Sequence, residues 1–148
     1  MVSAALAASA VHAAPAPTAA VFRTPTLSWI VPRATINGTQ ASRAFTAYQV
    51  SLPPDATRPT VIVSVWFANC DADTLAYAGG SESDEDLSPG RIMFPPGGPG
   101  HQQVISSNSS PAVRQVADAV CGVGAAEWAE APDLRALVKL EVERLKRR

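Results

Sequence analysis

The stretch Thr60–Cys70, TVIVSVWFANC, is the most strongly patterned part of this 148-residue chain. Alternate residues from Val61 to Phe67 form one apolar face, and the residues between them form a second one that only Ser64 interrupts. Its β-branched and aromatic residues favour an extended strand. Because a strand that is apolar on both sides needs cover on both sides, we expect this strand in the middle of a sheet.

Other segments typical of strands lie on both sides of this stretch. Leu27–Val31 is apolar, and Ala44–Leu52 alternates in character before a pair of prolines. Thr74–Ala78 ends at two glycines, and Arg91–Phe94 precedes the proline- and glycine-rich connection 95–100. These spacings predict a twisted antiparallel sheet of four to six strands.

Two helices are predicted in the last third of the chain. The first is Pro111–Cys121, with Ser110 as its N-cap and Gly122 after its end. Its valines recur at helical spacing, so we expect it to pack on one face of the sheet. The second runs from about Asp133 to Arg148, and Glu141 interrupts its apolar side. Whether this second helix packs on the domain or extends freely stays open. The expected fold class is therefore α+β: a small antiparallel sheet with one helix packed on one face, plus a C-terminal helix.

Cys70 and Cys121 are the two cysteines of the chain. In an exported protein an isolated pair is typical of a disulfide, and neither cysteine belongs to a CxxC motif. A bridge would tether the first helix to the end of the central strand. The alternative is two buried, unlinked thiols.

The N-terminal stretch is typical of a secretory signal. Residues 1–13 are small and apolar and end in a small-x-small pattern, although no Lys or Arg precedes them. An Ala-rich tail is the alternative. The expected organisation is a signal peptide over 1–13, a flexible leader over 14–20, a sheet-plus-helix domain over 21–125 and the C-terminal helix over 126–148.

Composition and charge narrow the class of partner. The formal net charge is −1, without the basic excess expected of a nucleic-acid-binding protein. We predict no integral membrane segment in the mature protein. Arginine is far more common than lysine and alanine is abundant, which hints at a G+C-rich bacterial genome.

No constellation of catalytic residues is recognisable in the sequence. His101 stands alone beside a Gly/Pro loop, and Pro96–Gly100 resembles a hydrolase oxyanion loop without the nucleophile motif such enzymes need. The acidic stretch Glu82–Asp86 could bind calcium weakly, but it lacks the spacing of a calcium loop. We predict no enzyme activity, no cofactor and no metal site.

Residues 61–122 resemble the surface-adhesin protein E family. The resemblance lies in Val63-Ser64-Val65-Trp66, in Cys70, and in the helix end Val120-Cys121-Gly122. It implies a small antiparallel sheet that carries a disulfide-tethered helix, and the family name implies surface adhesion. No functional residue beyond the two cysteines carries over. The Pro/Gly run 95–100 and the helix from Asp133 depart from the family pattern.

Together these features predict an exported, non-enzymatic bacterial protein of the periplasm or cell surface. We expect it to bind another macromolecule, a protein or another envelope component. One alternative is a small-ligand binder or an enzyme whose site is invisible in the sequence, and another is a structural component of the envelope. A pocket converging on His101 or on the acidic residues would favour the ligand binder, and a sheet with an exposed apolar patch would favour the macromolecule binder.

Overall fold

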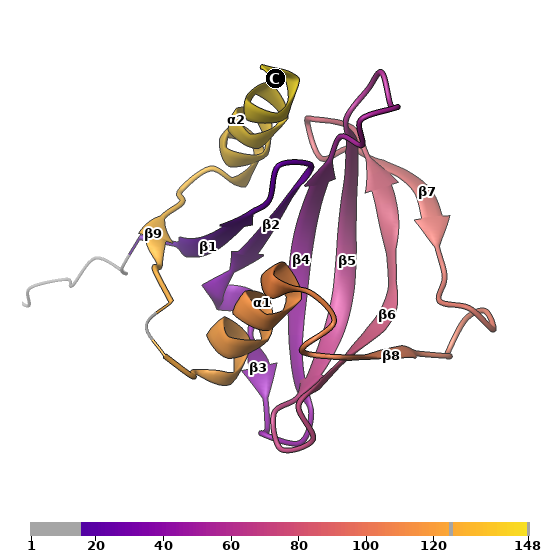
Figure 1. Cartoon of the computed structure of the whole chain (residues 1–148), viewed down its shortest axis with the longest axis vertical. Coiled ribbons are helices and arrows are strands. Elements are labelled where there is room, and N and C mark those ends of the chain that lie inside the picture. Colours follow the sequence, from indigo (N-terminus) through magenta and orange to yellow (C-terminus); the bar gives the residue numbers. More distant parts are fainter. Residues whose placement is uncertain (1–15, 125, 148) are drawn as a thin grey trace, which may run out of the picture.

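A computed structural model describes residues 16–124 and 126–147 of the chain. Within them the backbone forms one antiparallel sheet of nine strands, with one α-helix against each face (Figure 1). The main strand order is β7-β6-β5-β4-β2-β1-β9, while β3 pairs with β4 and β8 with β6. The strands are β1 (Thr18–Arg23), β2 (Leu27–Pro32), β3 (Asn37–Gly38), β4 (Arg43–Ser51), β5 (Thr60–Asn69), β6 (Thr74–Ser83), β7 (Pro89–Met93), β8 (Gln103–Ser106) and β9 (Ala129–Glu130).

Three helical segments complete the fold of the described residues. They are the 3-10 turn η1 (Arg33–Thr35) and the α-helices α1 (Pro111–Cys121) and α2 (Leu134–Lys146). Helix α1 begins as expected, since the backbone N–H of Val113 donates to Ser110 Oγ, and Gly122 ends it in the left-handed conformation. Helix α2 is capped by Asp133, whose carboxylate accepts from two backbone N–H groups. The sequence prediction of both helices is confirmed.

The first core lies between the sheet and α1. Its sheet side carries Trp66 and Ala68 of β5, together with Phe45 and Ala47 of the neighbouring strand β4. Three aromatic rings form a row here, with the Trp29 and Trp66 centroids 5.4 Å apart and those of Trp66 and Tyr77 5.2 Å apart. The valines of α1 close this core, as the helical spacing predicted.

The second core lies on the opposite face, under α2. Val138, Val142 and Leu145 of α2 are buried against Ile30, Val50 and Val61 of the sheet. The helix is therefore packed, which answers the alternative left open by the sequence. It covers only the part of the face formed by β1, β2 and the adjoining ends of β4 and β5.

The predicted fold class, α+β with a small sheet and a helix on one face, was wrong. The structure is dominated by a nine-stranded sheet, and the two α-helices lie on opposite faces. The extra strands are short or polar. Four of the five residues of β7 are exposed, and so are three of the four residues of β8. Strand pairing uses backbone groups that every residue except proline supplies in full, so these strands leave little signal in the side chains.

The N-terminal boundary also differs from expectation. Strand β1 begins at Thr18, so residues 18–20 of the expected flexible leader are paired with β2 and β9. The predicted signal peptide over residues 1–13 lies outside the described residues. No helix in the described ranges is long and apolar enough to cross a membrane.

Candidate binding surfaces

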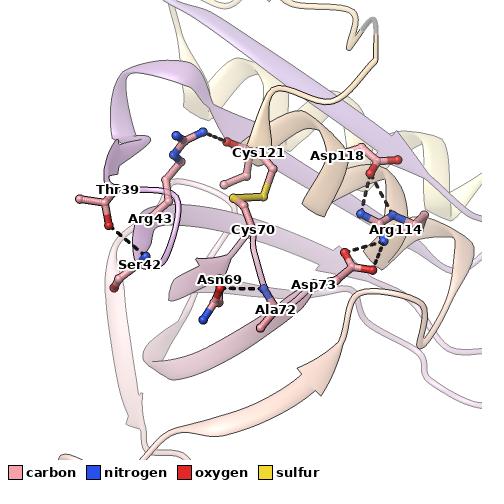
Figure 2. Close-up of a disulfide and its surroundings, with 11 residues drawn as sticks. Thr39, Ser42, Arg43, Asn69, Cys70, Ala72, Asp73, Arg114, Asp118 and Cys121 are labelled. Carbon is pink, nitrogen blue, oxygen red and sulfur yellow. Dashed lines mark hydrogen bonds and ion pairs between the residues drawn. A yellow bond between two sulfur atoms is a disulfide. The ribbon is translucent and has the colours of Figure 1, made fainter.

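The disulfide Cys70–Cys121 is present and joins the residue after β5 to the last residue of α1 (Figure 2). The two Cα atoms are 5.7 Å apart across 51 residues of sequence. Next to it, Arg43 Nη1 donates to the Val120 carbonyl over 2.9 Å, so β4 also holds the helix end. The bridge fixes the register of α1 on the sheet, and both cysteines have the structural role that the sequence predicted.

Arg114 makes a second connection between α1 and the strands. It donates to the Asp73 carboxylate over 2.7 and 2.8 Å, and to Asp118 over 2.6 and 2.9 Å (Figure 2). Asp73 lies in the turn between β5 and β6 and has a positive φ of 56°. These ion pairs are partly exposed, so they help to orient α1 more than they stabilise it.

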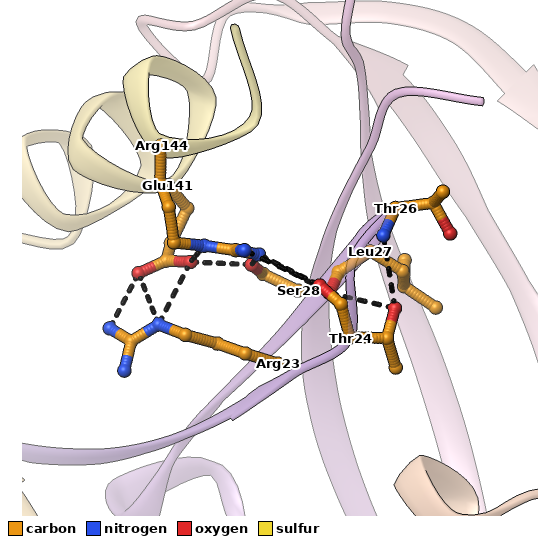
Figure 3. Close-up of polar contacts among 7 residues, drawn as sticks. All are labelled: Arg23, Thr24, Thr26, Leu27, Ser28, Glu141 and Arg144. Carbon is orange, nitrogen blue, oxygen red and sulfur yellow. Dashed lines mark hydrogen bonds and ion pairs between the residues drawn. The ribbon is translucent and has the colours of Figure 1, made fainter. Parts of the chain in front are cut away.

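Glu141 is the buried charged residue that connects α2 to the sheet. It is 2 % exposed, and it accepts from Arg23 over 2.6 Å, from Arg144 over 2.9 Å and from Ser28 (Figure 3). Arg144 also donates to Ser28 Oγ over 2.7 Å. Burial alone would raise the pKa of Glu141, but the hydrogen bonds from Arg23, Ser28 and Arg144 outweigh burial and lower it. We name these four residues the Glu141 cluster.

Among residues 16–124 and 126–147, no helix covers the α2 side of the sheet beyond the strands that α2 contacts. Val63, Val65 and Phe67 of β5 point to this side, because they alternate with residues buried under α1. In β6 the partner of Val65 is Gly79, which has a φ of 130° and no side chain to cover the valine. Val65 is 43 % exposed as a result.

The neighbouring strands extend this apolar surface. Val104 of β8 pairs with Ala76 and is 62 % exposed, and Ile92 of β7 pairs with Ser81 and is 66 % exposed. Cross-strand partners share a face, so these side chains continue the rows that begin at Phe67 and Val63. We name this surface the open sheet face; it consists of Val63, Val65, Phe67, Ile92 and Val104. The expectation that β5 is covered on both sides therefore holds for only part of its length.

Two clefts flank the other end of the sheet, at strand β1. A cleft of about 520 Å³ lies on the α1 side and includes Phe22, Asp118 and Glu127 in its lining. A smaller one of about 180 Å³ lies on the α2 side, lined in part by Leu137. Val21, Arg23 and Glu127 line both clefts, so the open space continues around the edge of β1.

The other residues singled out in the sequence do not come together. His101 is exposed in the connection between β7 and β8 and lines none of the clefts described for residues 16–124 and 126–147. In the acidic stretch, Asp86 pairs with Lys139 over 2.6 Å and Glu85 with Lys146 over 3.2 Å. These carboxylates therefore hold the loop against α2. In the described part of the chain, no group of three or more His, Cys, Asp or Glu side chains is placed to hold a metal ion.

Comparisons with family models, with curated proteins and with solved structures found no match for this chain. The resemblance of residues 61–122 to the surface-adhesin protein E family therefore stays a prediction. Function has to be argued from the surfaces themselves.

Sequence reasoning missed both binding surfaces. The β5 residues of the open sheet face were expected to be covered, because alternation shows that a side chain is apolar and not which helix covers it. The clefts beside β1 arise from a strand that was not predicted from the sequence and whose first three residues, 18–20, were expected to belong to the leader. The available signal for β1 was Thr18–Arg23 itself, where Val21-Phe22 precedes a Thr-Pro-Thr turn.

Proposed function

We propose that this chain is an exported, non-enzymatic protein of the bacterial periplasm or cell surface that binds another protein through the open sheet face. One observation carries the proposal: these five apolar residues share one side of strands β5, β7 and β8, only the small residues Ser81, Gly79 and Ala76 of β6 lie between them, and none of the five belongs to the core under α2. Large exposed apolar patches are typical of interaction sites. Export is supported by the disulfide, which persists in oxidising compartments.

The small-ligand alternative has less support. The sequence argument required a pocket converging on His101 or on the acidic stretch 82–86, and His101 lines none of the described clefts. Two clefts border the acidic stretch. One is lined by Glu82 and Asp84, is wide open to solvent and has no apolar side chain in its described lining. In the other, Asp84 and Glu85 share the lining with Arg58 and Lys146, and Glu85 is already paired with Lys146.

The proposal is tested by capture from envelope extracts with two matched variants. Val104→Lys places a charge in the open sheet face, whereas Gln103→Lys adds the same charge to the opposite side of the same strand. We expect the wild type and Gln103→Lys to capture the same partner in similar amounts. Val104→Lys should capture at least about tenfold less of it, because a lysine buried at an apolar interface has no counter-charge. Equal capture by the two variants would contradict the proposal.

A further inference from the structure

We infer that the edge of strand β1 binds an extended peptide segment whose side chains alternate between apolar and basic. This inference concerns a surface separate from the open sheet face and does not depend on the proposed function. It stands on the pairing of β1, the two clefts beside it and the charges that line them.

The outer edge of β1 is only half occupied. Strand β9 pairs with Thr18 and Ala19 and then ends at Ala129. From Val21 to Arg23, no backbone hydrogen bond from residues 16–124 or 126–147 reaches this edge. An unpaired strand edge is a template for another chain.

The backbone groups at this edge point outward. The turn between β1 and β2 closes with the N–H of Thr24 donating to the Leu27 carbonyl over 2.8 Å. Because hydrogen-bonded and non-hydrogen-bonded pairs alternate in an antiparallel ladder, Arg23↔Ser28 and Val21↔Ile30 are non-hydrogen-bonded pairs. The N–H and C=O of Val21 and Arg23 therefore face away from β2 and are available to an added strand.

The usual protection of an edge strand is missing here. Edges are commonly blocked by proline, by a bulge or by a free charged side chain, and residues 21–23 contain neither proline nor a register shift. Arg23 is charged, but its guanidinium is drawn toward α2 by two hydrogen bonds from Nε and one from Nη2 to Glu141. The Glu141 cluster thus keeps the one charged side chain of this segment engaged with α2.

The two clefts would receive alternate side chains of an added strand. A residue opposite Val21 would point to the α2 side, where the smaller cleft is lined by alanines, Val21 and Leu137. A residue opposite Phe22 would point to the α1 side, into the larger cleft. Strand addition of this kind takes its affinity from main-chain hydrogen bonds and its specificity from such alternate pockets.

Charge decides which side chain suits the larger cleft. Arg23, Asp118 and Glu127 line it, but Arg23 is paired with Glu141 and Asp118 with Arg114, so Glu127 is the carboxylate left for a ligand. The exposed Glu130 of β9 lines the smaller cleft. The described contacts give Glu127 and Glu130 no cationic partner. A lysine or arginine opposite Phe22 complements Glu127, whereas a second copy of this chain on the same edge would bring like charges together.

A short alternating peptide, acetyl-Val-Lys-Val-Lys-Val-amide, tests the inference directly by calorimetric titration into the full chain. We expect saturable binding that weakens as salt is raised, and no comparable binding of the glutamate analogue. Methylation of the valine nitrogens removes the donors that would face β1, so we expect it to weaken binding by at least about tenfold. Equal affinity of the methylated and parent peptides, or no binding of either, would overturn the inference.

Variants of the protein complete the test. Val21→Pro removes the outward N–H but leaves the β2 pairing intact, and Val21→Thr is its matched control. We expect the affinity for the peptide to fall about tenfold in the proline variant and about threefold in Glu127→Gln. Val104→Lys on the open sheet face should leave peptide binding unchanged. A wild-type dimer that Val21→Pro dissociates would place a second copy on the edge and overturn the assignment to a basic peptide.

Discussion

Two polar residues interrupt otherwise apolar patterns, and each has a defined role in the structure. Ser64 lies in the first core and accepts from Trp66 Nε1 over 2.9 Å, while its own hydroxyl faces the Ala47 carbonyl and Gln49. Glu141 lies in the second core and is held by Arg23, Ser28 and Arg144. Sequence periodicity located both interruptions. Most of the hydrogen-bond partners of Ser64 and Glu141 are more than ten residues away along the chain, so only the fold could identify these partners.

Ser64→Ala should destabilise the protein by about 1–2 kcal/mol. The change leaves the indole N–H of Trp66 buried without its acceptor, and an unsatisfied buried donor costs about that much. Urea unfolding followed by tryptophan fluorescence measures the effect. The control is Ser51→Ala at the half-buried end of β4, with an expected change under about 0.5 kcal/mol. Equal effects of the two substitutions would contradict the role assigned to Ser64.

Glu141 should make stability depend on acid pH. Its pKa in the folded protein is below the ordinary value of 4.5, so its ionised form stabilises the fold above that pH. This contribution is lost progressively as the pH falls from about the ordinary value through the lowered, folded-state pKa. Denaturation at a series of pH values should therefore show a falling free energy of unfolding on the acid side.

Glu141→Gln should reduce that acid dependence and destabilise the protein by about 2 kcal/mol at neutral pH. Removing one partner of a buried ion pair is costly, and the partial exposure of Arg23 and Arg144 keeps the loss below the fully buried case. Glu143→Gln, on the exposed side of the same helix, is the control. If the free energy of unfolding of the Glu141 variant fell with acid pH as steeply as that of the wild type, the Glu141 cluster would not couple α2 to the sheet.

At the scale of elements, side-chain pattern located the elements with a buried face. Strands β2, β4 and β5 and both α-helices fall within a few residues of their predicted bounds, because each has apolar residues at a regular period. Strands β7, β8 and β9 are mostly exposed, and β6 continues past Gly79-Gly80 to Ser83. Glycines usually end a strand, but here they accommodate the register shift beside Val65 and the close approach of Gly80 to the Val63 carbonyl.

The disulfide is the element-scale contact whose removal is easiest to measure. Cys70→Ala with Cys121→Ala should lower the free energy of unfolding by about 4 kcal/mol, because the bridge closes a loop with a sequence separation of 51 residues in the unfolded chain. Denaturant unfolding of the double variant and of the reduced wild type should agree. A loss under about 1 kcal/mol would mean that the hydrogen bond of Arg43 to the Val120 carbonyl and the ion pair of Arg114 with Asp73 suffice to hold α1 against the sheet.

At the scale of the whole molecule, the sheet is larger than its two helices can cover. Helix α1 closes one face around Trp66, whereas α2 is confined to the strands near β1 by the Glu141 cluster. Within the part of the chain that the structure describes, the open sheet face and the edge of β1 lie outside the cover of either helix. Sequence alone could not predict this outcome, because it depends on where α2 docks, and docking is set by contacts between residues more than a hundred positions apart.

Replacing a residue of the open sheet face should separate stability from binding. Val104→Lys lies on an exposed position, so we expect its free energy of unfolding to stay within about 0.5 kcal/mol of the wild type. Thermal and urea unfolding measure that difference. A large loss of stability would instead assign Val104 to the core and remove it from the proposed interface.

Site-specific photo-crosslinking in β8 tests the binding role of the open sheet face most directly. A photoreactive residue at position 104 lies on that face, and the same residue at position 103 points to the opposite side of the strand. In cells that produce the full chain, we predict a discrete protein adduct from position 104 and none from position 103. Equal adducts from both positions, or no adduct from position 104, would contradict the account.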